Sequence, residues 1–254
     1  METTILGYHN KIVSLESYIT KNRDKWFATD LNWILPFPTS KKPYNWFLHK
    51  SERKKLDGVK FDVFERSTGE QPEKVFYYWN GNEVDLNLKE SLHFFLTQIK
   101  LTNNWTPIFT FGLLLHKTNI GDYVWYQRYE PTEPFVRARN LIGIYTVKHL
   151  EDSDLPENLK GHKAVLISLR SVPKDMVPIK LSRKEPQIIW HGAYLLVENG
   201  EKTMVHKFDS EDEGGWLFQP LANFAFPKYV QEEAVLATEY IKNHKEELKK
   251  KCEL

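Results

Sequence analysis

Residues 187–208, QIIWHGAYLLVENGEKTMVHKF, contain the signal that decides the fold class of this chain. Two apolar-rich runs, 187–197 and 202–208, flank the polar tetrapeptide Glu198-Asn199-Gly200-Glu201. An Asn-Gly pair between alternating apolar runs is typical of a type I′ turn, because both central residues of that turn need a positive φ. The stretch therefore predicts an antiparallel β-hairpin with Asn199 and Gly200 as its loop.

Further strands are predicted upstream of this hairpin, in short runs of apolar residues. They span residues 59–65, 74–79, 107–116, 123–128, 141–147 and 164–169. Three other segments carry apolar residues at helical spacing, at 11–26, 87–100 and 229–251. These strands and helices do not alternate as β-α-β units, so the sequence predicts an α+β fold with a mostly antiparallel sheet.

The segment 151–158 is acidic and contains a proline, which is typical of a boundary within a fold. It divides a predicted N-terminal α+β part, residues 1–150, from a predicted C-terminal hairpin-plus-helix part, residues 159–254. A single continuous domain is the alternative at this length. The C-terminal helix is amphipathic, which predicts that its apolar stripe lies on the core or on a partner surface. The stripe consists of Val230, Ala234, Ala237, Ile241, His244 and Leu248.

Composition excludes several classes of protein. The chain has 254 residues with 35 basic and 34 acidic side chains, a formal net charge of +1 that argues against a polybasic tail. The hydrophobic share of 41% and the aromatic share of 14% argue against disorder. Cys252 is the single cysteine, which excludes an intramolecular disulfide. With neither a signal peptide nor a long apolar run in the sequence, we expect a cytoplasmic protein without a membrane span.

Motifs of established spacing for cofactors and metals are missing from the sequence. It contains no Walker A pattern, no glycine-rich dinucleotide fingerprint, no His-Glu-x-x-His and no cysteine-based zinc pattern, so no cofactor and no metal are predicted. Without a metabolic motif, a recognition protein of a defence or mobile-element system is the expected context. Whether the chain is an enzyme stays open, because acids scattered in the sequence can still assemble a nuclease site.

Positive charge is concentrated in two segments of this nearly neutral chain. Residues 41–60 hold seven Lys and Arg against two acids, and residues 160–184 hold seven against one. Because phosphate binding depends on local potential, the two segments favour binding of nucleic acid or a nucleotide. Aromatic side chains within 41–60 suit base stacking, and arginine forks suit phosphates. The predicted binding residues are Lys41, Lys42, Tyr44, Trp46, Lys50, Arg53, Lys54, Arg128, Arg137, Arg139, Arg170 and Arg183.

Two triplets of the form His-x-Ser/Thr end apolar runs, at His49-Lys50-Ser51 and His116-Lys117-Thr118. The pair resembles the signature of the 2H phosphoesterases, in which two histidines act as general acid and base on a phosphodiester. The resemblance implies a metal-independent phosphodiesterase with His49 and His116 as catalytic residues and with Ser51 and Thr118 holding the phosphate. It covers six positions, and a lysine stands where the middle residue is usually apolar. A pair of structural histidines at strand ends is the alternative.

Two further possibilities stay open. In the predicted hairpin register Ala193 faces His206, which makes His191 and His206 diagonal neighbours that could share a phosphate or a metal with Asp209. Satisfied structural histidines are the alternative. The third class of function is a noncatalytic protein–protein adaptor, or a homodimer, that uses the helix at 229–251.

Overall fold

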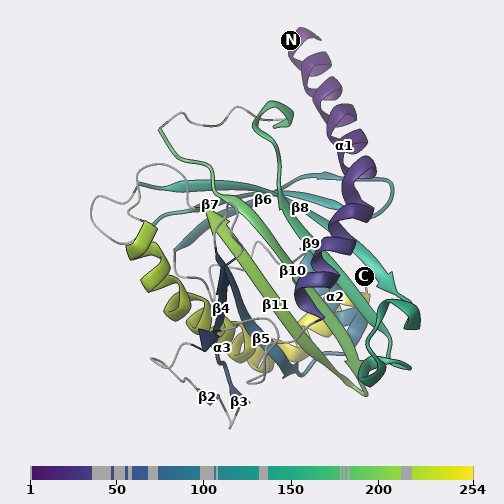
Figure 1. Cartoon of the computed structure of the whole chain (residues 1–254). Coiled ribbons are helices and arrows are strands. Elements are labelled where there is room, and N and C mark those ends of the chain that lie inside the picture. Colours follow the sequence, from purple (N-terminus) through teal and green to yellow (C-terminus); the bar gives the residue numbers. More distant parts are fainter. Residues whose placement is uncertain are drawn as a thin grey trace.

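The structure, a computed structural model, describes residues 2–35, 47–48, 55–56, 59–67, 74–97, 106, 108–131, 137–177, 179, 181, 184–212 and 219–253. These residues form three α-helices, α1 (Glu2–Ile34), α2 (Leu88–Thr97) and α3 (Gln219–Glu253). Their strands are β1 (Phe47–Leu48), β2 (Lys55–Leu56), β3 (Val59–Lys60), β4 (Phe64–Ser67), β5 (Lys74–Val84), β6 (Phe109–Lys117), β7 (Tyr123–Tyr129), β8 (Arg139–Leu150), β9 (Ala164–Ser171), β10 (Ile189–Asn199) and β11 (Lys202–Asp212). The predicted α+β class with a C-terminal helix is confirmed (Figure 1).

Within the described residues, nine strands form one antiparallel sheet in the order β1-β4-β5-β11-β10-β9-β8-β7-β6, and β2 pairs with β3 separately. The sheet joins distant parts of the chain, because β5 pairs with β11. It also runs across the segment 151–158, since β8 on one side of that segment pairs with β9 on the other. The division into residues 1–150 and 159–254 stays a prediction.

The hairpin that decides the fold is β10–β11, and its loop differs by one residue from the predicted loop. Asn199 pairs with Lys202, so the loop residues are Gly200 and Glu201, and Gly200 has a φ of 63°. The strand β10 continues through Asn199 because the preceding Glu198 N–H donates to the carbonyl of Lys163 at 2.8 Å. The shift moves every cross-strand pair by two positions relative to the predicted register.

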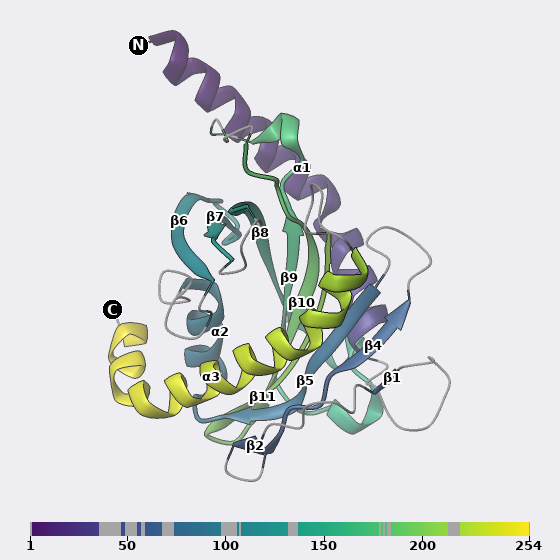
Figure 2. The ribbon, with the colours of Figure 1, turned by 90° about the vertical axis from the view of Figure 1, so that its left-hand side faces the viewer.

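Each face of the sheet is covered by helices. The helices α2 and α3 pack on one face and α1 on the other, so that the sheet forms a central layer (Figures 1 and 2). Side chains that alternate along β10 enter both cores, with Trp190 on the α2–α3 side and Leu195 on the α1 side. This two-sided burial explains why the hairpin sequence is apolar almost throughout. No helix of the described residues is long and apolar enough to cross a membrane.

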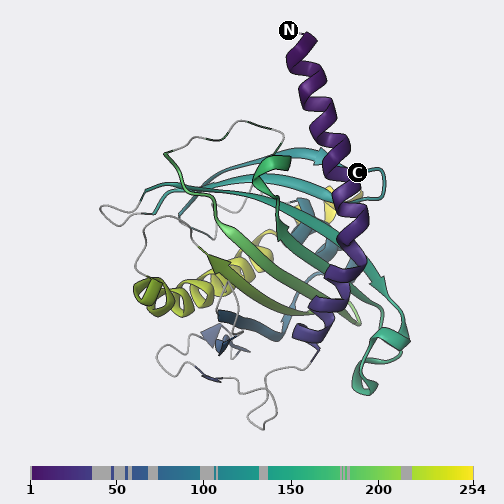
Figure 3. The ribbon, with the colours of Figure 1, turned by 45° about the horizontal axis from the view of Figure 1, so that its top comes forward.

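Helix α1 crosses its face of the sheet, and its N-terminal turns extend beyond the sheet (Figure 3). Its buried stripe begins near Ile12 and continues through Leu15 and Ile19, both with no exposed surface. The stripe ends at Ile34, which is also fully buried. Helical spacing of these apolar residues therefore accounts for the contact between α1 and the sheet.

Helix α3 buries the apolar stripe that the sequence indicated. The side chains concerned pack into the core between α3, α2 and the sheet, and they are Val230, Ala234, Ala237, Ile241 and Leu248. The adaptor hypothesis is wrong in this respect, because the stripe is covered by the chain itself. Association through other parts of 229–251 stays a prediction. The helix begins at Gln219, includes Pro227, and bends at His244, where φ is −118° and ψ is 17° (Figure 2).

Candidate functional site

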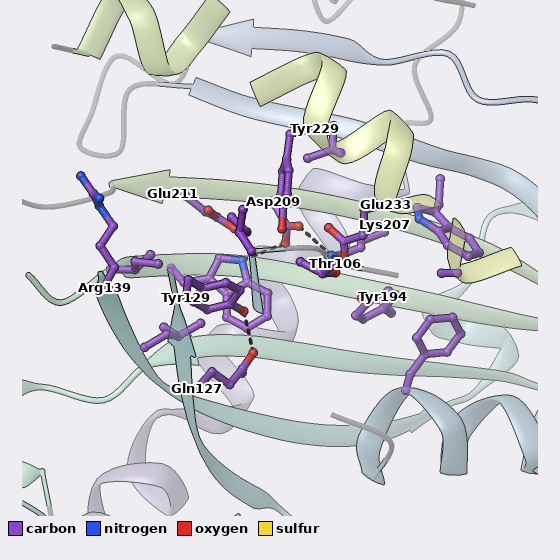
Figure 4. Close-up of a pocket in the computed structure, with 18 of the residues that line it drawn as sticks. Thr106, Gln127, Tyr129, Arg139, Tyr194, Lys207, Asp209, Glu211, Tyr229 and Glu233 are labelled. Carbon is purple, nitrogen blue, oxygen red and sulfur yellow. Dashed lines mark hydrogen bonds and ion pairs between the residues drawn. The ribbon is translucent and has the colours of Figure 1, made fainter. Parts of the chain in front are cut away.

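A cavity of about 110 Å³ lies between the sheet and the two helices α2 and α3. Its apolar wall is largely aromatic and comes from β5, α2, β8, β10 and α3. The residues of this wall include Trp79, Phe94, Phe95, Leu141, Tyr194 and Val230. Its polar residues gather on β7, β8, β11 and α3, and they include Gln127, Arg139, Lys207, Asp209, Glu211 and Glu233 (Figure 4).

Strand β11 supplies the charged centre of the cavity wall. Lys207, Asp209 and Glu211 alternate along the strand, so all three side chains project to the same face of the sheet. Lys207 Nζ lies 2.8 Å from Asp209 Oδ2, and both side chains are almost fully buried, at 4% and 3% exposed. Burial alone would lower the pKa of Lys207, but the charge of Asp209 and the other acidic groups nearby raise it well above its ordinary value.

Asp209 is held by donors from three directions. Trp190 Nε1 donates to Oδ1 at 2.9 Å, and the Tyr78 hydroxyl and Lys207 donate to Oδ2. Gly192 is the cross-strand partner of Asp209, and a Cβ there would overlap Asp209 Oδ1 and lie 2.9 Å from the Phe208 carbonyl oxygen. A glycine at 192 thus leaves the space that the carboxylate occupies.

Aromatic rings surround the Lys207 ammonium. Nζ lies 4.8 Å from the ring centres of both Tyr78 and Tyr194 and 6.0 Å from that of Trp190. Cation–π attraction of this kind is worth about 2 kcal/mol when the cation is desolvated. Burial raises the pKa of the Tyr194 hydroxyl above its ordinary value, so the phenol stays neutral and can donate or accept a hydrogen bond.

A second polar group lies on β7. Gln127 Nε2 donates to the Tyr145 hydroxyl at 2.9 Å, and Gln127 Oε1 accepts from the Tyr129 hydroxyl at 2.7 Å. Burial raises the pKa of both tyrosines well above the ordinary value. The amide is therefore fixed in orientation by two neutral phenols.

Glu233 reaches the cavity from α3, opposite β11 (Figure 4). Its nearest cationic partner is Lys207, at a separation of 4.0 Å, and its side chain is 20% exposed. Burial raises the pKa of Glu233 above its ordinary value, while the charge of Lys207 opposes that change. The cavity therefore combines aromatic walls with a few polar groups that can orient an amphipathic molecule.

Ten of the residues predicted to form a site lie outside the described residues. They are Lys41, Lys42, Tyr44, Trp46, His49, Lys50, Ser51, Arg53, Lys54 and Arg183.

The second predicted phosphodiesterase triplet lies away from the cavity. His116 Nε2 is 2.8 Å from Glu16 Oε1 of α1, on the opposite side of the sheet. The Thr118 hydroxyl accepts the N–H of Asp122 at 2.9 Å and thereby stabilises the β6–β7 turn. Neither residue lines the cavity, and both have structural partners.

The predicted arginines are dispersed, and three of the four that are described do not reach the cavity. Arg128 pairs with Glu185 at 3.1 Å and with Glu130 at 3.0 Å, while Arg137 is exposed. Arg170 pairs with Asp30 of α1 at 2.6 Å. Arg139, which is 4% exposed, lines the cavity. In the described part of the chain the arginines therefore do not form one phosphate-binding face.

The predicted pairing of His191 with His206 is wrong, because of the register shift in the hairpin. His206 faces Leu195 and His191 faces Ser210, so the two histidines are not diagonal neighbours. His191 Nε2 lies 2.8 Å from Asp30 Oδ1. Across the ranges that the structure describes, no three His, Cys, Asp or Glu side chains lie close enough to hold a metal ion.

His206 is expected to make the stability of the protein depend on pH. It is 6% exposed, its Nδ1 lies 2.9 Å from the Tyr77 hydroxyl, and burial lowers its pKa from 6.5 to about 4. The unfolded chain therefore binds more protons than the folded chain between these two values. Stability present above pH 6.5 is lost as the pH falls, by about 2 kcal/mol at pH 5.

Urea unfolding at a series of pH values measures this loss. The His206→Gln variant is the control, because it lacks the titrating group, and its unfolding free energy should fall less between pH 7 and pH 5. Equal slopes for the two proteins would contradict the assignment.

The residues that form the cavity were largely missed by sequence reasoning. Lys207 and Asp209 are charged residues two positions apart at the end of a strongly apolar hairpin, which places both on one buried face. That pattern was the available signal. The sequence around Glu233 gives no signal of a cavity residue, because an acid on an amphipathic helix is ordinarily solvated.

Comparison with known proteins shows a similar fold at low sequence identity. No family model matches the sequence, and no curated protein matches it significantly. The human StAR-related lipid transfer protein 5 is 16% identical with a TM-score of 0.66, over 90% of this chain and 98% of that one. A STAR-related lipid transfer protein fragment from Xanthomonas axonopodis is 18% identical with a TM-score of 0.58, over 78% of this chain and 98% of the fragment. The lipid transfer and protein localization domain of human StarD13 is 14% identical with a TM-score of 0.57, over 78% of this chain and 89% of that one. The chain therefore has the fold of StAR-related lipid transfer domains.

These findings overturn the predicted functions. Nucleic-acid or nucleotide binding and a 2H-like phosphodiesterase or nuclease are both wrong, because the fold is that of lipid transfer domains. The described geometry agrees, since the charged residues that line the cavity are two basic and three acidic ones rather than a basic face. The triplet resemblance arose because His116 and Thr118 happen to lie at a strand end and in the following turn.

Proposed function

We propose that the chain binds a lipid or another largely apolar small molecule in the cavity between the sheet and α3. The observation that carries the proposal is a cavity whose apolar wall is largely aromatic and which also has a small polar group, the usual composition of a small-molecule site. The titles of the similar structures, which name lipid transfer, support it. A cytoplasmic location belongs to the same proposal, because a chain with a single cysteine cannot form an intramolecular disulfide, which suits a reducing compartment.

The size of the cavity limits what can enter without rearrangement. Its volume of about 110 Å³ is below the ~300–1,000 Å³ of typical small-molecule pockets. A ligand with a long acyl chain therefore requires α3 to move away from the sheet. The α3 side of the cavity includes Val230 and the small side chain of Ala237.

The Ala237→Phe variant tests the proposal. Ala237 is 4% exposed and lines the cavity, so a phenyl group at this position would occupy the space meant for the ligand. Affinity for N-phenyl-1-naphthylamine, an uncharged apolar dye that brightens in apolar surroundings, should fall by about tenfold or more. Fluorescence titration of the delipidated protein measures the change.

Thr238→Phe is the matched control. Thr238 is the next residue on α3, is partly exposed and does not line the cavity. This variant should bind the dye as the unmodified protein does. Dye binding that is absent from the unmodified protein, or unaffected by Ala237→Phe in a folded variant, would overturn the proposal.

A further inference from the structure

The positive and negative charges of the residues that line the cavity are unequal in number. Two of them are basic, Arg139 and Lys207, and three are acidic, Asp209, Glu211 and Glu233. Arg139 and Glu211 line one end of the cavity, away from Glu233 (Figure 4). The balance at the centre is therefore set by one ammonium group and two carboxyl groups.

Lys207 and Asp209 form an ion pair, and the aromatic rings around them provide further contacts. Asp209 already accepts from Trp190, Tyr78 and Lys207. The ammonium of Lys207 lies against Asp209 and over two tyrosine rings. A carboxylate or phosphate ligand would have to replace Asp209 at this ammonium, at the cost of leaving Asp209 buried without its cation.

Glu233 is the charged group of the cavity whose carboxyl oxygens can still accept hydrogen bonds from a ligand. Among the described residues no hydrogen bond to its carboxyl group is found, and its ion pair with Lys207 spans 4.0 Å, which is longer than a hydrogen bond. Burying an acid with so little compensation is costly unless a ligand supplies a donor. Its side chain lines the cavity and is 20% exposed.

The same wall already stabilises a positive charge. Lys207 remains a cation in nearly complete burial because tyrosine and tryptophan faces and carboxylates surround it. Phe95 and Tyr194, whose ring centres are 4.6 Å apart, continue this aromatic surface along the cavity. A second ammonium placed at Glu233 would lie near the Lys207 ammonium, but the carboxyl groups of Asp209 and Glu233 together offset both positive charges.

We propose that the ligand of this cavity is an amphipathic molecule with a basic amine, whose N–H groups donate to Glu233 while its apolar part lies against the aromatic wall. The inference rests on the proposed function, because it names the chemistry of the ligand for the same cavity. It distinguishes this class from fatty acids and other anionic amphiphiles and from neutral alcohols such as sterols.

The experiment compares three six-carbon ligands with the same chain: hexylamine, hexanol and hexanoate. Their affinities for the delipidated protein are measured near pH 7 by calorimetry or by displacement of N-phenyl-1-naphthylamine. Because a charge-assisted hydrogen bond is stronger than a neutral one, hexylamine should bind about tenfold more tightly than hexanol. Hexanoate should bind more weakly than hexanol.

The Glu233→Gln variant identifies the residue responsible. It has nearly the same shape without the charge, so the advantage of hexylamine over hexanol should disappear while hexanol binding stays unchanged. Glu232→Gln is the matched control, because Glu232 precedes it on α3 and does not line the cavity. The control should keep the preference for the amine.

The possible failures can be told apart. If none of the three ligands nor the dye binds, the proposed function itself fails. If hexanol or hexanoate binds as tightly as hexylamine, or if Glu233→Gln keeps the preference, the cavity binds apolar molecules and the assignment of an amine is wrong.

Discussion

The Asp209→Asn variant is expected to lose about 3–5 kcal/mol of its free energy of unfolding. The substitution leaves Lys207 buried, at 4% exposed, without the carboxylate that lies 2.8 Å from its Nζ. Trp190 and Tyr78 also lose a charged acceptor. Guanidinium unfolding followed by circular dichroism measures the loss.

Two comparisons show whether the loss comes from the stranded ammonium. Adding Lys207→Met to Asp209→Asn removes the uncompensated charge, so the double variant should be more stable than the single one. Glu83→Gln breaks an exposed pair with Lys202 and should cost less than about 1 kcal/mol. An Asp209→Asn protein as stable as the Glu83→Gln protein would contradict this account of the cavity wall.

The Asp30→Ala variant is expected to lose about 3 kcal/mol and to loosen α1 from the sheet. Asp30 has no exposed surface, and its Oδ1 lies 2.6 Å from Arg170 Nη2 and 2.8 Å from His191 Nε2. These contacts join the C-terminal half of α1 to β9 and β10. The side chain of Arg170 is 12% exposed, and its guanidinium is left without its carboxylate, which is the main cost.

Urea unfolding gives the global effect, and amide hydrogen exchange gives the local one. Exchange within residues 27–34 of α1 should accelerate more than exchange within β10. Asp24→Ala, at an exposed position of the same helix, should change stability by less than about 0.5 kcal/mol. Asp30→Ala with the stability of Asp24→Ala would show that Asp30 does not hold the helix.

The fold class could be predicted from the sequence because its signals are local. The apolar alternation around Asn199 and Gly200 indicated the hairpin, and the regular stripe on 229–251 indicated the last helix. The predicted loop lies one residue early because Gly200 suits either position of a two-residue loop, and the sequence pattern alone does not distinguish the two registers.

Helix ends were less predictable for physical reasons that particular residues show. Pro227 would ordinarily end a helix, yet α3 continues through it from Gln219. In α1 the buried position 30 is an aspartate, which interrupts the apolar stripe although the helix continues to Ile34. Tertiary partners, Arg170 and His191, make that aspartate compatible with burial.

The site was hidden because its parts come together only in three dimensions. Charge density along the chain is highest in 41–60 and 160–184 and therefore favours these two segments as binding sites. The cavity instead takes one charged residue from β8, three from β11 and one from α3, and pairing rather than density along the chain sets their effect. Aromatic residues are ordinarily expected in the core, and several of those in this chain belong both to the core and to the cavity wall.

Because α3 both closes the cavity and completes the core, ligand size and helix docking are thermodynamically coupled. Val230 and Ala237 contribute to the main core and also line the cavity. A ligand that fits the closed cavity binds without the cost of displacing α3. A larger ligand binds only those molecules in which α3 is displaced, so its apparent affinity is the intrinsic affinity multiplied by the fraction of such molecules. The stability of α3 packing therefore limits the size of the ligands that bind, and substitutions far from the polar group can raise or lower this limit.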